Sequence, residues 1–220
     1  KTFNAFDPGT PKPEKPLDES LLEAFSGGSE FRDSMLEALC RATDVVDLRG
    51  ERNTAETLDA MDAGAPVIVG GALPADEQGH RVGSPDALVR GADRPGGRPG
   101  YWPLRVKPYR LLEKQRNAKE LRTSRLVSPT VLEPLPGYRF RSYRQGVLLE
   151  LAHHWRLLQA CGRSAATPVV GSIGFDDHNR GMIVWVPLEL RFLRTFSRTS
   201  ANGHRLRSAL ERYDHEHGFR

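Results

Sequence analysis

The sequence predicts a mixed α/β domain, and three observations lead to that prediction. Apolar residues recur at helical spacing near the start, the middle and the end of the chain. Between these segments lie short runs rich in Val, Ile, Leu and aromatic residues, bounded by Gly, Pro and Asp, which are typical of strands. The chain has 220 residues, of which 38% are hydrophobic, so it can bury one sizeable core. This order of elements indicates a mixed central sheet flanked by helices.

The chain is expected to hold a tail and one domain. Residues 1–16 are rich in Pro, Lys and Asp and predict a flexible tail, which leaves residues 17–220 as a single domain. The chain begins without Met and ends inside a predicted helix, as a fragment of a longer protein would. No apolar run reaches the length of a membrane span and the first residues lack a secretory signal, which predicts a soluble cytoplasmic protein.

Helices are expected in the first quarter of the domain. The apolar spacing in residues 17–42 predicts a short helix and a longer one, interrupted at Gly27 and Gly28. Residues 45–48 are a candidate strand. Thr54 is expected to cap a further short helix, because an acid lies in the turn that follows it.

The middle of the chain changes from helical to strand periodicity. Residues 66–73, 80–90 and 101–110 predict three consecutive strands, arranged as an antiparallel meander. Residues 112–138 are polar and basic, which predicts a long loop.

The second half of the chain returns to the same elements. Residues 143–161 predict an amphipathic helix, and residues 168–175 and 181–190 predict two strands joined by a turn at 176–179, DDHN. A last helix is expected over residues 204–213.

Positive charge is concentrated in one part of the chain. The formal net charge is +4, and residues 105–144, here called the basic strip, hold eleven basic side chains against three acidic ones. Such a strip can neutralise the phosphates of DNA, and a solvated loop without a ligand would have the same composition. The side chains expected to contact nucleic acid are Arg105, Arg110, Lys114, Arg116, Lys119, Arg122 and Arg125.

Several chemically distinctive residues are expected to be structural. Cys40 and Cys161 are isolated from each other, which predicts buried thiols and no zinc cluster or disulfide. His153 and His154 are adjacent on a helix and point in different directions, so we expect core-edge histidines and no shared metal. The three tryptophans lie in apolar runs, so we expect them to pack in the core and not to stack on bases. They are Trp102, Trp155 and Trp185.

One set of motifs carries a resemblance to a known family. The motifs are TLDAMDAGAPVIVGGAL, GSPDALVR, YWPLRVKPYR and LLELAHHWRLLQACG, in that order. Over residues 28–187 the chain resembles RecB-like nucleases of the PD-(D/E)XK superfamily, of the type found in actinobacteria. The resemblance implies a restriction-endonuclease-like fold, DNA as the partner and a role in DNA repair.

The resemblance also implies a site for Mg²⁺ or Mn²⁺. Asp86 matches the first strand acid and Lys107 matches the lysine, while Glu30 and Glu37 are candidates for the helix acid that completes the metal shell. Converging carboxylates can hold a hard divalent ion that activates water for attack on a phosphodiester. The lysine shares a strand face with the residue two positions before it, because side chains alternate along a strand.

The chain departs from the family pattern at three positions of this site. Arg105 occupies the position of the second strand acid, and Arg32 occupies the position of the helix glutamate. A supporting glutamine is expected near Leu148, but Gln145 lies about one turn earlier. An arginine beside the metal position adds a repulsive charge, so activity requires another acid, such as Asp33 or Glu113, to move in.

Three hypotheses follow from these motifs. In the first, the chain is a RecB-like nuclease that hydrolyses DNA with a metal held by Asp86. In the second, it is an inactive nuclease-like domain that binds DNA or a protein partner through the basic strip. In the third, it is a structural module of a larger repair protein. Acids around Asp86 would favour hydrolysis, and arginines around it would favour binding alone.

Overall fold

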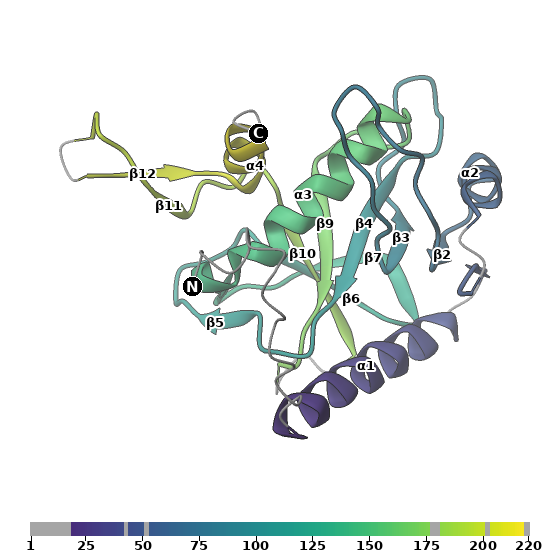
Figure 1. Ribbon diagram of the computed structural model, residues 1–220, viewed down its shortest axis with the longest axis horizontal. Coiled ribbons are helices and arrows are strands. Elements are labelled where there is room, and N and C mark those ends of the chain that lie inside the picture. Colours follow the sequence, from purple (N-terminus) through teal and green to yellow (C-terminus); the bar gives the residue numbers. More distant parts are fainter. Residues whose placement is uncertain (1–18, 42–43, 51–52, 177–180, 201–202, 218–220) are drawn as a thin grey trace, which may run out of the picture.

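The computed structural model describes residues 19–41, 44–50, 53–176, 181–200 and 203–217, and it shows an α/β domain. A large, curled, eight-stranded mixed sheet has the strand order β1-β2-β3-β4-β9-β10-β6-β7, and helices lie around it (Figure 1). The predicted mixed sheet with flanking helices is therefore confirmed. The tail expected over residues 1–16 lies outside the described residues.

The elements follow one another as α1 (Glu19–Cys40), β1 (Val45–Asp47), α2 (Thr54–Asp62), β2 (Val67–Val69), β3 (Ala87–Arg90), β4 (Tyr101–Val106), β5 (Leu112–Lys114), β6 (Arg122–Arg125), β7 (Ser128–Pro134), β8 (Tyr138–Phe140), the 3₁₀ helix η2 (Ser142–Arg144), α3 (Gln145–Ala160), β9 (Val169–Ile173), β10 (Met182–Pro187), β11 (Leu193–Phe196), β12 (His204–Arg207) and α4 (Ala209–His217).

The first helix is continuous, so the predicted break at Gly27 and Gly28 is wrong. A glycine inside a helix costs only about 1 kcal/mol relative to alanine. Leu36 and Leu39 are buried in the core, and their burial offsets such a cost. At Gly28 a side chain would also approach Pro108, because a Cβ there would lie 3.3 Å from the proline Cγ atom.

The predicted antiparallel meander is confirmed. Strand β3 pairs antiparallel with both β2 and β4, and β1 joins the edge parallel to β2. Strand β9 then pairs parallel with β4 and antiparallel with β10. The N-cap of α2 is Asn53, not Thr54 as predicted, since the Asn53 side chain accepts hydrogen bonds from the backbone of Ala55 and Glu56.

The loop predicted over residues 112–138 is wrong, because this segment holds β5, β6, β7 and part of β8. Strand β6 pairs with β10 and extends the main sheet, and β5 and β8 form a separate pair. Buried Leu112, Leu121, Thr123 and Leu126 anchor the segment between its basic residues. The pattern is hard to find in the sequence because a β-bulge shifts the register between β6 and β7.

The last predicted helix begins too early. Residues 204–207 form β12, and α4 follows Ser208. The Ser208 side chain accepts a hydrogen bond from the Glu211 backbone at 3.1 Å, and the Glu211 carboxylate accepts one from the Ser208 backbone at 2.9 Å. This reciprocal arrangement is a capping box, and it fixes the helix start.

The core lies between the sheet and α3, which buries residues such as Leu148, Leu151 and Trp155. Trp102 and Trp185 contact each other across the sheet with ring centroids 5.3 Å apart. All three tryptophans are buried, as predicted. Within the described residues, the helices include none that is both long and apolar enough to span a bilayer.

Candidate functional site

Asp86 lies at the entry to β3, beside the end of β4. Its backbone N–H donates to the carbonyl of Leu104 at 3.0 Å, which extends the ladder between the two strands by one residue. The residue is 1% exposed. Its Oδ2 atom accepts a hydrogen bond from the Val106 backbone at 2.8 Å. The two strands therefore hold this carboxylate in a fixed, buried position.

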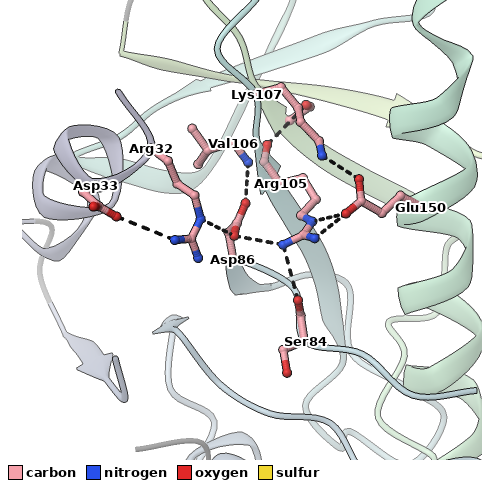
Figure 2. Close-up of polar contacts among 9 residues, drawn as sticks. Arg32, Asp33, Ser84, Asp86, Arg105, Val106, Lys107 and Glu150 are labelled. Atoms are coloured by element: carbon pink, nitrogen blue, oxygen red, sulfur yellow. Dashed lines mark hydrogen bonds and ion pairs between the residues drawn. The ribbon is translucent and has the colours of Figure 1, made fainter. Parts of the chain in front are cut away.

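Two arginines converge on the other carboxylate oxygen of Asp86. The Nε atom of Arg32, from α1, lies 2.7 Å from Oδ1, and the Nη1 atom of Arg105, from β4, lies 2.9 Å from the same oxygen. Figure 2 shows the Asp86 side chain between these two guanidinium groups. The sequence left open whether acids or arginines surround Asp86, and the structure places arginines there.

A second carboxylate enters the site from α3. Glu150 Oε1 accepts a hydrogen bond from Arg105 Nε at 2.7 Å, and Glu150 Oε2 lies 2.7 Å from Lys107 Nζ. Arg32, Asp86, Arg105, Glu150 and Lys107 therefore form a chain of alternating charges, here called the charge network (Figure 2).

The network shifts the pKa values of its members. Burial raises the pKa of Glu150, but the Lys107 hydrogen bond and the Arg105 charge outweigh it, so the pKa lies below its ordinary value. Burial lowers the pKa of Arg105, but Asp86 and Glu150 raise it above the ordinary value overall. Both residues therefore stay charged and paired at neutral pH.

Strand alternation places Arg105 and Lys107 on one face, as the sequence predicts, because both reach Glu150. Lys107 and Asp86, the two residues that match the family motif, do not pair with each other. Lys107 pairs with Glu150, and Asp86 pairs with the two arginines.

The acids expected to complete a metal shell lie elsewhere. Glu37 pairs with Arg49 at 3.2 Å, and Glu30 is exposed on α1. Asp33 lies 3.6 Å from Arg32 and so faces the arginine. Among the described residues there is no group of three or more His, Cys, Asp or Glu that could hold a metal ion. The residues around Asp86 thus do not fit Mg²⁺ or Mn²⁺.

One further acid and one amide that were candidates for the site, Glu113 and Gln145, contact other residues instead. Glu113 pairs with Arg139 at 2.6 Å. Gln145 accepts a hydrogen bond from Arg212 of α4. The residue that the sequence analysis missed is Glu150. Its signal is a lone acid in the apolar stretch VLLELA, where a solvent-facing residue would be out of place.

Some side chains of the basic strip make contacts within the fold, and many of them are exposed. Arg105 belongs to the charge network, and Arg144 lies over the Tyr109 ring, 3.9 Å from its centroid. Arg141 donates to the Leu112 carbonyl at 2.6 Å. Arg110 and Arg139 are exposed and also make contacts, Arg139 with Glu113. The other exposed side chains of the strip are Lys114, Arg116, Lys119, Arg122 and Arg125.

His153 and His154 of α3 pack against other residues of the fold, as predicted. His154 is buried, and burial and the nearby Arg105 lower its pKa to about 3, so it is neutral. His153 Nε2 lies 2.9 Å from the Val82 carbonyl, which can only accept, so this nitrogen carries the proton. Its Nδ1 atom then accepts from the Tyr213 hydroxyl at 2.8 Å.

The remaining candidates support the fold. Asp176, the first residue of DDHN, is buried and accepts hydrogen bonds from the backbones of Leu111 and Leu112. The rest of that motif lies outside the described residues. Cys40 and Cys161 are free and half-buried, and burial is the main cause that raises both thiol pKa values, to about 11 for Cys40.

Comparison with protein-family models, with curated proteins and with solved structures gives no match. The fold and the site together define an α/β domain in which Asp86, the most buried acid of the described residues, pairs with two arginines.

Proposed function

We propose that this chain is a nuclease-like domain, related in fold to restriction endonucleases, that binds DNA without metal-dependent hydrolysis at Asp86. The observation that carries the proposal is the pairing of Asp86 with Arg32 and Arg105. These arginines occupy the two positions where the resemblance leads us to expect carboxylates. The hydrolytic alternative would require both guanidinium groups to leave a carboxylate that is 1% exposed.

Electrostatics oppose a cation at this carboxylate. Two unit charges 4 Å apart interact by about 4 kcal/mol at an effective dielectric constant of 20, and the energy doubles for a divalent ion. A metal bound to Asp86 would gain attraction to one carboxylate and meet repulsion from two guanidinium groups beside it. The electrostatic energy at Asp86 therefore favours pairing with the arginines over binding of Mg²⁺ or Mn²⁺.

The exposed cations of the basic strip support a polyanionic partner. Lys114, Arg116 and Lys119 lie at the end of β5 and in the segment that follows it, and all three are exposed. Phosphate contacts release counterions, so the logarithm of the binding constant falls with the logarithm of salt concentration by about 0.9 for each contact. Binding through this strip is therefore expected to be strongly salt-dependent.

The test is binding of fluorescent double-stranded DNA by the whole chain, with EDTA and then with Mn²⁺. We expect equal binding in both solutions and no cleavage. A variant with Lys114, Arg116 and Lys119 changed to Ala is expected to bind at least about tenfold more weakly, because it loses three phosphate contacts. The matched control, Arg98→Ala, removes one exposed charge from a loop elsewhere.

Two outcomes would overturn the proposal. One is cleavage that depends on Mn²⁺ and is lost in Asp86→Asn, which would establish a metal-dependent nuclease. The other is failure of the wild-type chain to bind DNA at low salt, which would leave the structural-module hypothesis.

A further inference from the structure

Strands β11 and β12 form a hairpin that stands apart from the main sheet. They pair antiparallel in a two-stranded sheet of their own. Figure 1 shows this hairpin extending away from the body of the domain, next to α4. Leu193 is fully buried and anchors the base of the hairpin. An isolated two-stranded hairpin gains little stability in water, so such an extension is expected to have a partner.

The hairpin and its flanks carry charge of one sign. Residues 190–210 contain five arginines and no Asp or Glu. Arg191, at the base, pairs with Glu211 of α4. The exposed arginines Arg194, Arg198 and Arg205, and half-buried Arg207, are not within ion-pair distance of an acid in the described part of the chain. The hydrogen bond from Ser208 is the main cause that holds the pKa of Glu211 below its ordinary value, and the charge of Arg205 adds a smaller effect. The arm therefore presents an excess of positive charge, most of it without an acid in contact.

Cross-strand pairing assigns these side chains to two faces. Thr195 lies opposite Arg205, and Leu193 lies opposite Arg207, so both arginines share one face. On the other face, Arg194 lies opposite Leu206, next to Phe196. Phe196 is 72% exposed and Leu206 is 53% exposed. Each face thus offers positive charge, and one also offers apolar surface.

We propose that the β11–β12 hairpin is an arm that enters a groove of double-stranded DNA. The major groove is about 12 Å wide and admits a two-stranded β-ribbon. Arg205 and Arg207 are about 6.8 Å apart along the strand, which matches two steps of about 3.4 Å between phosphates along the DNA axis. Phe196 and Leu206 supply the apolar contacts that thymine methyl groups and sugars accept.

This inference rests on the proposed function for the identity of the partner, but it uses different side chains. The basic strip and the arm use different strands, since β5 and β6 lie outside the two-stranded sheet of β11 and β12. The two regions meet at the base of the arm, where Arg139 and Arg191 line one hollow. Their contributions can therefore be measured separately.

The experiment compares the whole wild-type chain with a variant in which Arg194, Arg205 and Arg207 are all changed to Ala. Binding is followed by fluorescence anisotropy with double-stranded DNA, single-stranded DNA of the same sequence, and vesicles of phosphatidylserine and phosphatidylcholine. We expect at least about a tenfold loss of duplex affinity and a salt slope that is shallower by about 2.7, which is three contacts at 0.9 each. The control variant replaces the same three arginines with lysine, and it should stay within about threefold of wild type because lysine also neutralises phosphates.

The outcomes separate the arm from the basic strip. An alanine variant of the arm that binds duplex like wild type, while the basic-strip variant binds weakly, would overturn the arm and leave the proposed function intact. Equal losses for duplex and single strands would overturn groove entry. Binding to vesicles but not to DNA would overturn both proposals, as would a wild-type chain that binds neither.

Discussion

The charge network and the β11–β12 arm use the same residue type in opposite ways. In the network, Arg105 is 23% exposed and lies between two carboxylates. On the arm, Arg205 is exposed and pairs across the strands with Thr195. An arginine that pairs with carboxylates inside the fold is part of the fold, whereas one without an acid at ion-pair distance remains available to an external anion. Charge content alone therefore identifies no binding surface, because the acids within reach decide what each arginine does.

The comparison is tested most strongly by Asp86→Ala. The substitution leaves Arg105 facing Arg32 without the carboxylate between them, and Val106 loses its hydrogen-bond acceptor. Removing one partner of a buried ion pair destabilises a protein by about 3–5 kcal/mol, and partial exposure of the arginines puts our expectation near the lower end. Urea unfolding followed by circular dichroism measures the change. A loss within about 0.5 kcal/mol, typical of surface sites, would contradict a structural role for the network.

A double variant tests whether the arginines alone exclude a metal. Arg32→Glu with Arg105→Asp would place new carboxylates near Asp86 and Glu150, with Lys107 retained. We expect a less stable protein that Mn²⁺ restores, by about 2.7 kcal/mol when the metal is at 100 times its dissociation constant. Calorimetric titration and thermal unfolding with and without Mn²⁺ measure the effect. Wild type, titrated in parallel, should show no such gain.

Glu150→Gln tests the half of the network that lies toward α3. The change weakens the contacts to Arg105 and Lys107, and hydrogen bonds to charged groups contribute about 1.5–3 kcal/mol each. Glu150 is partly exposed, so we expect a loss of about 1 kcal/mol at pH 7, measured by urea unfolding.

The same variant predicts a difference in pH dependence. The Glu150 pKa in the folded protein lies below its ordinary value of 4.5. The stabilisation that this carboxylate provides is therefore complete when the pH is above its ordinary pKa. It is lost as the pH falls through the pKa that the carboxyl has in the folded protein. Unfolding curves between neutral pH and the acid range should converge for wild type and Glu150→Gln. A gap that stays constant with pH would show that the ionised carboxylate is not the cause.

The smallest effect on stability is expected on the arm. Arg205→Ala removes an exposed side chain without an acid at ion-pair distance in the described part of the chain, so stability should change by less than about 0.5 kcal/mol. The same urea unfolding experiment measures it. A larger loss would show that the hairpin arginine supports the fold and would weaken the comparison.

Local patterns in the sequence predicted several elements correctly. Helices α2 and α3, the meander β2–β4 and strands β9 and β10 follow from apolar periodicity. Predictions failed where the local signal was weak or mixed. Basic residues masked the buried positions of β6, and two glycines suggested a break in α1 that burial of Leu36 and Leu39 overrides.

The sequence by itself determined that Arg105 and Lys107 share one face, because strand alternation is a property of neighbouring residues. It predicted a strand from residue 80 to residue 90, whereas β3 begins at Ala87, so the place of Asp86 at the strand entry came from the structure. Only the tertiary structure decided which charges meet there. Arg32 comes from a position 54 residues before Asp86, and Glu150 from one 45 residues after Arg105. Contacts between such distant residues depend on how α1 and α3 pack against the sheet, and packing is not encoded in any local period.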